Sequence, residues 1–280
     1  MLPLNFHQTF IPERRLIGSL LDFVALGKQG SYSEIAEETG IPMGKYSGKV
    51  PAIMNYAKGM GLLYLGKADK AGVYKPKLTD FGKVVFLEDK LMGERIVQLL
   101  AHFNLCRDDI GALAWHTLFA EASSLGNSFT KAELDEFLAV RFGSANKRGR
   151  IGPMINVYID DAALARSSVL KVSDERLRAN TKININKIPL FETFARPYAA
   201  YITDLIELIF PKQIQVAITD FNIKTKWFNI CKLQNDDIKT LFDLIERKGL
   251  LSFDRQRKPW IIEKRYSASD LWTQIFYDLA

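Results

Sequence analysis

The stretch SYSEIAEETGIPMGKYSGKVPAIMNYAKGMGLLY, residues 31–64, decides the fold that we expect for this chain. Ser31 stands three residues before Glu34, a capping-box pair that opens a short helix, and Gly40 closes that helix. Apolar residues then recur every three or four positions, which predicts a second, longer helix. This helix starts near Gly48, because Pro51 is tolerated only in the first turn of a helix.

A hairpin is expected to follow the longer helix. Gly61 ends the helix, residues 62–65 read as a strand, and the hairpin extends to residue 81, while a further helix over residues 16–27 precedes the whole stretch. Short helix, tight turn, longer helix and strand, in this order, are the layout of a winged helix-turn-helix, in which helix start and wing meet DNA. A protein partner and ordinary surface charge are the alternatives for this module. The DNA-binding residues that we predict here are Lys45, Tyr46, Lys49, Lys67 and Lys70.

The same theme recurs between residues 128 and 190. Thr130 with Glu133 forms a second capping box, which opens a helix over residues 132–142. The turn GSANKRGR, residues 143–150, then leads into another helix and holds the densest basic cluster of the chain. It lacks the Gly-Lys-Ser/Thr triplet of a P-loop, so we expect no nucleotide-triphosphate site. The predicted DNA-binding residues of this second module are Asn146, Lys147, Arg148 and Arg150.

A third candidate module occupies residues 191–280. A helix over residues 199–210, one or two helices over 214–233, and a helix over 236–248 capped by Asn235 are expected in turn. The segment GLLSF at 249–253 echoes GLLYL at 61–65, and a basic hairpin tip and a returning strand at 260–262 follow it. The predicted DNA-binding residues of this tip are Arg255, Arg257 and Lys258.

We therefore expect a mainly α protein built from tandem winged-helix-turn-helix-like modules with small β-wings. The expected domains are an N-terminal winged helix with a lead-in segment (1–90), a helical linker with a second helix-turn-helix-like module (91–190) and a C-terminal winged-helix-like module (191–280). The threefold theme is too divergent to detect by identity, but agreement among three motifs supports one architecture.

Composition limits the class of protein. Of the 280 residues 48% are hydrophobic, enough for a packed core, but no run approaches 18 apolar residues, so we expect no membrane span. The N-terminus lacks a secretory pattern, and Cys106 and Cys231 show no CxxC spacing, which favours a cytoplasmic protein with reduced thiols. The three histidines form no ligand pattern, so neither a metal nor a cofactor is expected. The net charge of +6 is concentrated in the three expected modules and is compatible with a polyanionic partner.

Motifs of known catalytic sites are missing from the sequence. It contains no Gly-x-Ser-x-Gly and no HExxH, and its adjacent aspartate pairs, such as Asp160–Asp161, would diverge by about 100° on a helix. We therefore predict no catalytic residues and no enzymatic activity.

Four short motifs carry a resemblance to a known family: FHQTF at residues 6–10, LAWHTLF at 113–119, FTKAEL at 129–134 and GLL at 249–251. In these motifs the chain resembles a bacterial family of unknown function encoded in phage-defence and DNA-phosphorothioation gene clusters. Its members often lie beside a phosphoadenosine-phosphosulfate-reductase-like protein. The resemblance covers nearly the whole chain. The family start reads Gly-His-Glu-Thr-Phe, so Gln8 here removes a His–Glu pair.

The resemblance implies a defence-associated accessory protein that binds DNA or joins a complex. Together with the basic clusters it predicts a non-catalytic accessory protein of a bacterial anti-phage or DNA-modification (phosphorothioation-type) system. The expected partners are double-stranded DNA and a phosphoadenosine-phosphosulfate-reductase-like or other defence-system protein. Two alternatives stay open: a scaffold subunit for a sulfurtransferase-like or nuclease partner, and a transcriptional regulator of the defence cluster.

Overall fold

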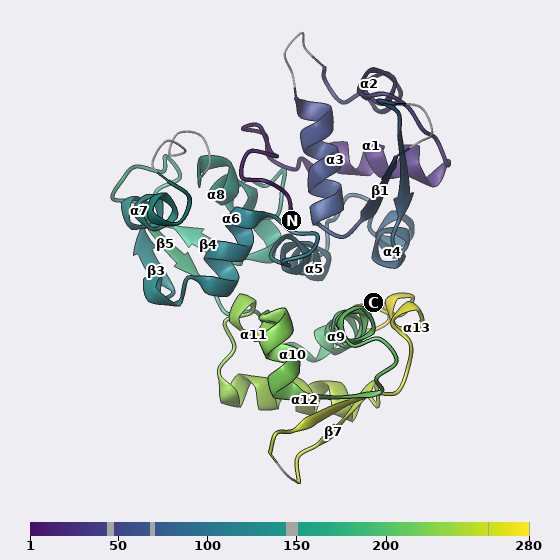
Figure 1. Cartoon of the computed structure of the whole chain (residues 1–280), viewed down its shortest axis with the longest axis vertical. Coiled ribbons are helices and arrows are strands. Elements are labelled where there is room, and N and C mark those ends of the chain that lie inside the picture. The colour runs from purple at the N-terminus through teal and green to yellow at the C-terminus, as the bar shows by residue number, and fades with distance from the viewer. Residues whose placement is uncertain (44–47, 68–70, 144–150, 257, 280) are drawn as a thin grey trace. The chain divides into compact units, whose positions relative to one another are not determined.

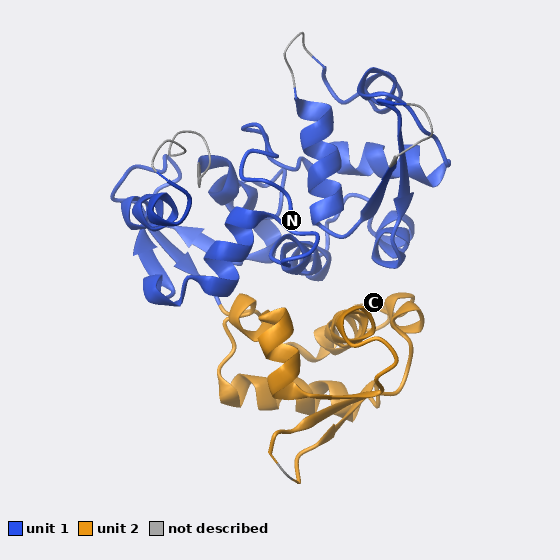
Figure 2. Ribbon diagram, viewed as in Figure 1, with its two compact units in different colours: residues 1–186 blue, residues 187–280 orange. Residues whose placement is uncertain are grey.

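The computed structural model describes residues 1–43, 48–67, 71–143, 151–256 and 258–279 (Figure 1). The chain is mainly α-helical with small antiparallel sheets, and no described helix is long and apolar enough to cross a membrane. It forms two compact units, residues 1–186 (unit 1) and residues 187–280 (unit 2), shown in Figure 2. The first two expected domains, 1–90 and 91–190, therefore lie in unit 1 apart from residues 187–190.

Unit 1 begins with three helices and a hairpin. The elements are α1 (Arg14–Ala25), α2 (Tyr32–Thr39), α3 (Lys49–Gly59), the antiparallel strands β1 (Leu63–Lys67) and β2 (Tyr74–Leu78), and α4 (Asp80–Glu88). The expected capping box is confirmed, since Ser31 and Glu34 exchange hydrogen bonds at the start of α2. Gly30, between α1 and α2, forms two backbone hydrogen bonds with Tyr74, of 2.8 and 3.1 Å. The hairpin β1–β2 is therefore extended beyond β2 by a bridge of a single residue.

The second half of unit 1 repeats this order. Helix α5 (Arg95–Leu105) is followed by α6 (Leu113–His116), which continues into the π-helical turn η1 (Thr117–Glu121). Then come β3 (Ser128–Thr130), α7 (Lys131–Phe142), α8 (Ile151–Ile159), β4 (Leu170–Val172) and β5 (Lys182–Ile185). The strands form one antiparallel sheet in the order β3-β5-β4. The second predicted capping box is also confirmed, because Thr130 and Glu133 cap α7.

Unit 2 shows the order once more. Its elements are α9 (Ala195–Ile209), β6 (Gln215–Ala217), α10 (Ile218–Thr225), α11 (Trp227–Ile230), α12 (Asn235–Arg247), β7 (Leu251–Asp254), β8 (Ile261–Lys264) and α13 (Ala268–Trp272). The antiparallel sheet has the order β6-β8-β7. Near the end of the chain, the carboxylate of Asp278 pairs with Arg196 at 2.9 Å and with Lys248 at 3.1 Å.

In the second and third repeats the first strand pairs with the last, and in the first repeat the single residue Gly30 pairs with β2. The sequence predicted the main helices and the hairpins of the first and third repeats, but no bounds were predicted for β4 and β5, and β3 and β6 were missed. A three-residue strand is too short to show periodicity and forms only where a partner strand is present. The predicted cap of α12 was wrong by one residue. Gln234 precedes the helix and donates its N–H to the side chain of Asp237, 2.9 Å away.

Helix α5 crosses the core of unit 1 and is buried along its length after Arg95. Its polar residues are buried with their hydrogen bonds satisfied. Gln98 donates to the Met92 carbonyl at 2.8 Å and accepts from the Ser167 N–H at 3.1 Å, while Nδ1 of His102 lies 2.7 Å from the Tyr158 hydroxyl. These bonds fix α5 to the segment just before it and to Tyr158 and Ser167, which follow it by more than 50 residues within the second half of unit 1.

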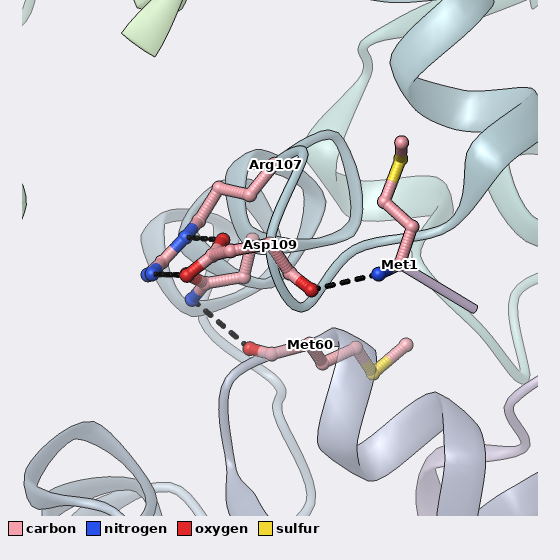
Figure 3. Close-up of polar contacts among 5 residues, drawn as sticks. Met1, Met60, Arg107 and Asp109 are labelled. Carbon is pink, nitrogen blue, oxygen red and sulfur yellow. Dashed lines mark hydrogen bonds and ion pairs between the residues drawn. The ribbon is translucent and has the colours of Figure 1, made fainter. Parts of the chain in front are cut away.

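A polar cluster beside the C-terminal end of α5 holds the start of the chain (Figure 3). Arg107 forms a two-bond pair with Asp109, 2.6 and 2.8 Å long, and the Asp109 carbonyl accepts from the amino group of Met1 at 2.8 Å. Burial raises the pKa of the Asp109 carboxyl, but the hydrogen bond and charge of Arg107, together with the backbone N–H groups of Ile110 and Asp109, outweigh burial and hold that pKa below its usual value. The side-chain NH₂ group of Asn104 donates a hydrogen bond to the Met60 carbonyl at 3.0 Å. A Cβ at Gly61, whose φ is +74°, would collide with the Asn104 side chain.

The lead-in segment packs onto α3, as expected. The centre of the Phe6 ring lies 4.8 Å from the centre of the Tyr56 ring and 5.7 Å from that of the Trp115 ring. The Tyr56 hydroxyl donates a hydrogen bond to the Phe10 carbonyl. Nδ1 of His7 accepts the Thr9 N–H at 3.2 Å, a local hydrogen bond of the kind that the sequence predicted.

Candidate nucleic-acid interface

The start of α3 is the first expected contact with DNA. Lys45 and Tyr46 lie outside the described residues, and Lys49 is the first residue of the helix. Its Nζ is 2.6 Å from Oε1 of Glu13 and 5.5 Å from the centre of the Phe10 ring, and its side chain is 16% exposed. The charge of Lys49 is therefore compensated within unit 1.

The body of α3 is mostly covered. Seven of its eleven residues are buried, because α1 and α2 pack on one side and the lead-in segment and α5 on another. Pro51, Asn55 and Lys58 are half-buried and follow each other at helical spacing. Only this narrow stripe of the described helix is available for a groove of DNA.

The hairpin β1–β2 presents a more open surface. Tyr64 pairs with Lys77, and Gly66 pairs with Lys75, so these four residues share one face of the hairpin, which we call the first sheet face. Tyr64 is 65% exposed and both lysines are exposed. The opposite face packs inward through Leu63 and Pro76.

The lysines of the first sheet face carry uncompensated charge. Within the described part of the chain, neither Lys75 nor Lys77 has an ion-pair partner. Lys83 on α4 is paired with Asp80 at 2.8 Å, which raises the pKa of its ammonium group above the usual value, so its charge is compensated. Gly66 is required here, because a Cβ would approach the Lys75 carbonyl oxygen to 2.8 Å. Of the other expected wing residues, Lys67 ends β1 opposite Tyr74, and Lys70 lies outside the described residues.

The β3-β5-β4 sheet also has a basic outer face, the second sheet face. Asn184 in the central strand pairs with Lys171 on one side and Ser128 on the other, and Lys182 pairs with Thr130. Both lysines are exposed, whereas Phe129 and Ile183 on the opposite face are buried. The predicted cluster of this module, Asn146, Lys147, Arg148 and Arg150, lies outside the described residues between α7 and α8.

The corresponding face of the sheet in unit 2, the third sheet face, carries charges of both signs. It has Gln215, Glu263 and Ser252 in one paired row and Asp254 in the next, and Gln215 hydrogen-bonds Glu263 at 3.3 Å. The guanidinium of Arg265 hydrogen-bonds the Ser252 hydroxyl at 3.3 Å on the same face. Basic outer faces are thus found on the described sheets of unit 1, and one of mixed charge on the described sheet of unit 2.

The residues predicted for the basic tip of unit 2 differ in their surroundings. Arg255 is half-buried and pairs with Asp243 at 2.9 Å and Glu246 at 3.3 Å, both on α12. Its guanidinium also lies 6.0 Å from the centre of the Trp260 ring. Lys258 is exposed, and Arg257 lies outside the described residues. The hairpin therefore brings Arg255 and Lys258 to one tip but engages only Arg255 in ion pairs.

Tyr64 is not among the DNA-binding residues predicted from the sequence. The signal was present, because Leu63 and Leu65 alternate with Tyr64 and Gly66 as in a strand with one buried face. No group of three or more histidine, cysteine, aspartate or glutamate side chains that could hold a metal ion occurs among the residues that the structure describes.

Comparison with known proteins identifies a shared fold. No known protein-family profile matches the chain, and no curated protein matches it. A crystal structure of magnesium ion-bound SspB superposes with a TM-score of 0.68 at 13% identity, and a crystal structure of SspB with 0.67 at 12%. Each alignment covers 98% of this chain and 87% of the other. At this identity the likeness establishes that the chain has a fold similar to that of SspB.

Proposed function

We propose that the chain is a non-catalytic accessory protein that binds double-stranded DNA through the first and second sheet faces of unit 1. The observation that carries the proposal is the difference in charge among three topologically equivalent faces. Exposed lysines occupy the two faces of unit 1, which are Lys75 and Lys77 on the first and Lys171 and Lys182 on the second, whereas the face of unit 2 carries Glu263 and Asp254 beside Arg265. The stability of the sheets does not require their outer faces to differ in charge, whereas attraction of a polyanion requires a basic face.

The repeated order of elements supports a winged-helix-like identity for the three modules. In each, a segment before the second helix pairs with the last strand of a hairpin that follows the third helix; this segment is a strand in the second and third modules and the single residue Gly30 in the first. In this proposal the hairpins act as wings. The wings make the main contacts because α3, the helix expected in the major groove, is largely covered.

Contacts of this type recognise phosphate rather than base sequence. Each lysine that neutralises a phosphate releases counterions, which makes the affinity fall steeply with salt. Tyr64 adds a hydroxyl and a ring on the same face, where it would contact the sugar–phosphate backbone.

We further propose that the protein acts in a bacterial anti-phage or DNA-modification system of the phosphorothioation type. The support is the resemblance in the motifs at residues 6–10, 113–119, 129–134 and 249–251. A phosphoadenosine-phosphosulfate-reductase-like or other defence-system protein is the partner that this resemblance implies.

The test is a titration of labelled duplex DNA with the whole protein at about 50 and 200 mM salt. Each phosphate contact contributes a slope of about 0.9 in the plot of log affinity against log salt, or about 3.5-fold over this range. The variant Lys75→Gln/Lys77→Gln should bind more weakly and lower the slope by about 2.

A matched variant, Lys224→Gln/Lys239→Gln, removes two exposed lysines of unit 2 and the same net charge. It should bind duplex DNA like the unchanged protein. Equal losses in the two variants would show that only net charge matters, and no binding at low salt would refute the proposal.

A further inference from the structure

Unit 2 contains a groove that the proposed duplex contacts do not use. It has a volume of about 690 Å³, within the usual range of small-molecule sites, and lies between α10, the first turn of α12 and the β7–β8 connection. Its apolar walls are Ile218, Phe228, Ile238, Pro259 and Trp260.

The polar residues of the groove are few and suit a nucleobase. Asn222 and Asn235 supply side-chain amides, which match the mixed donor and acceptor edge of a base. Oδ1 of Asn222 accepts the Phe228 N–H at 3.2 Å, which leaves its NH₂ group for a ligand. Trp260 is half-buried and offers the largest aromatic surface of the lining.

Charge in the groove favours an anion at one end. Lys258 is the charged member of the lining, and no carboxylate occurs among the described lining residues. Asp236 and Asp237 lie in the first turn of α12, so the start of that helix does not suit a phosphate. A phosphate would therefore lie beside Lys258, with its base against Trp260.

We infer that this groove binds an unpaired nucleotide of a DNA strand, with the base stacked on Trp260 and the phosphate next to Lys258. The inference rests on the proposed function and deepens it, because it gives the protein a second contact that only unpaired DNA satisfies. Stacking between a base and an aromatic side chain is tolerant of sequence, as expected for a protein that binds DNA broadly.

Tryptophan fluorescence provides the measurement. Trp115, Trp227 and Trp272 are 0%, 1% and 2% exposed, so Trp260 is the tryptophan that a ligand can reach. A short oligothymidylate should quench the fluorescence of the whole protein, and Trp260→Phe should abolish the quenching. In parallel, anisotropy of a labelled oligothymidylate should show binding weakened about 5- to 150-fold in Trp260→Ala and within about threefold of the unchanged protein in Trp260→Phe.

Lys258→Gln provides a second variant that does not alter the packed wall of the groove. It should weaken oligothymidylate binding several-fold and reduce its salt dependence. Unchanged binding by both Trp260→Ala and Lys258→Gln, or no quenching at any oligonucleotide concentration, would overturn the inference. Equal affinity for thymidine monophosphate would also overturn it, because the site would then take a free nucleotide and not a strand.

Failure of this inference can be distinguished from failure of the proposed duplex binding. Trp260→Ala should leave duplex affinity unchanged, whereas Lys75→Gln/Lys77→Gln should leave unchanged the extent to which a saturating oligothymidylate quenches Trp260. If the wing variants bind duplex DNA normally while Trp260 is quenched, the duplex proposal alone fails.

Discussion

Replacing Gln98 by methionine should destabilise unit 1, although methionine has a similar volume and suits a helix. Gln98 is fully buried in the middle of α5. It is hydrogen-bonded to the Met92 carbonyl at 2.8 Å and to the Ser167 N–H at 3.1 Å. The methionine would remove both hydrogen bonds, and the two backbone groups would keep only their other contacts, from the Ser167 N–H to the Leu164 carbonyl at 3.1 Å and from Arg14 to the Met92 carbonyl at 3.4 Å.

The magnitude follows from the two backbone groups. A hydrogen bond within a protein contributes ~0.5–1.5 kcal/mol net, so the loss of two should cost about 1–3 kcal/mol. This corresponds to an increase of about 5- to 160-fold in the population of unfolded unit 1. Volume contributes little, because the two side chains are of similar size.

Hydrogen exchange resolved by peptide is the suitable assay. The buried backbone amides of α5 exchange with solvent when unit 1 unfolds. Their exchange rates should therefore rise by the same factor as the population of unfolded unit 1. Amides of α9 and α12 in unit 2 serve as an internal control and should be unchanged. A change in α5 exchange of less than about threefold would refute the reasoning.

The variant Gln98→Glu tests the two hydrogen bonds separately. A carboxylate still accepts from Ser167 but faces the Met92 carbonyl with a negative oxygen, and burial raises the pKa of such a group. Unit 1 of this variant should therefore be least stable at high pH and gain stability as the pH falls, when the protonated acid donates to Met92. Loss of stability on acidification would contradict this account.

Three further predictions concern other contacts. Gly61→Ala should cost unit 1 about 2–5 kcal/mol in urea unfolding, from its φ of +74° and a clash, whereas Gly72→Ala, at +77° with nothing within 4 Å, should cost only about 1–2 kcal/mol. The pair with Arg107 stabilises unit 1 above the usual carboxyl pKa of about 4, and this contribution disappears as the pH falls through the lowered pKa of Asp109. In Asp109→Asn the free energy of unfolding of unit 1 should therefore fall less steeply below about pH 4, and the same pH dependence as in the unchanged protein would contradict this. Asp278→Asn breaks two ion pairs and should speed proteolysis of residues 273–279 several-fold, while equal cleavage would exclude a clamping role.

Local signals in the sequence were sufficient for most of the helices. The capping boxes at Ser31 and Thr130 each involve residues within four positions of each other. They could therefore be predicted from the sequence, and both are present in the structure. The strands β3 and β6 were missed because their hydrogen-bond partners, β5 and β8, lie more than 40 residues away. Such strands are defined by pairing and not by their own residue pattern.

The candidate interface depended more on tertiary structure. The sequence by itself determined the number of basic residues in each module and the alternation that exposes Tyr64. Only the tertiary structure decided which charges are available, because it places Glu13 against Lys49 and the carboxylates of α12 against Arg255, while the first sheet face has none. The physical reason is that charge pairing depends on distances of a few ångströms between segments that are remote in the chain, and spacing along the sequence does not encode them.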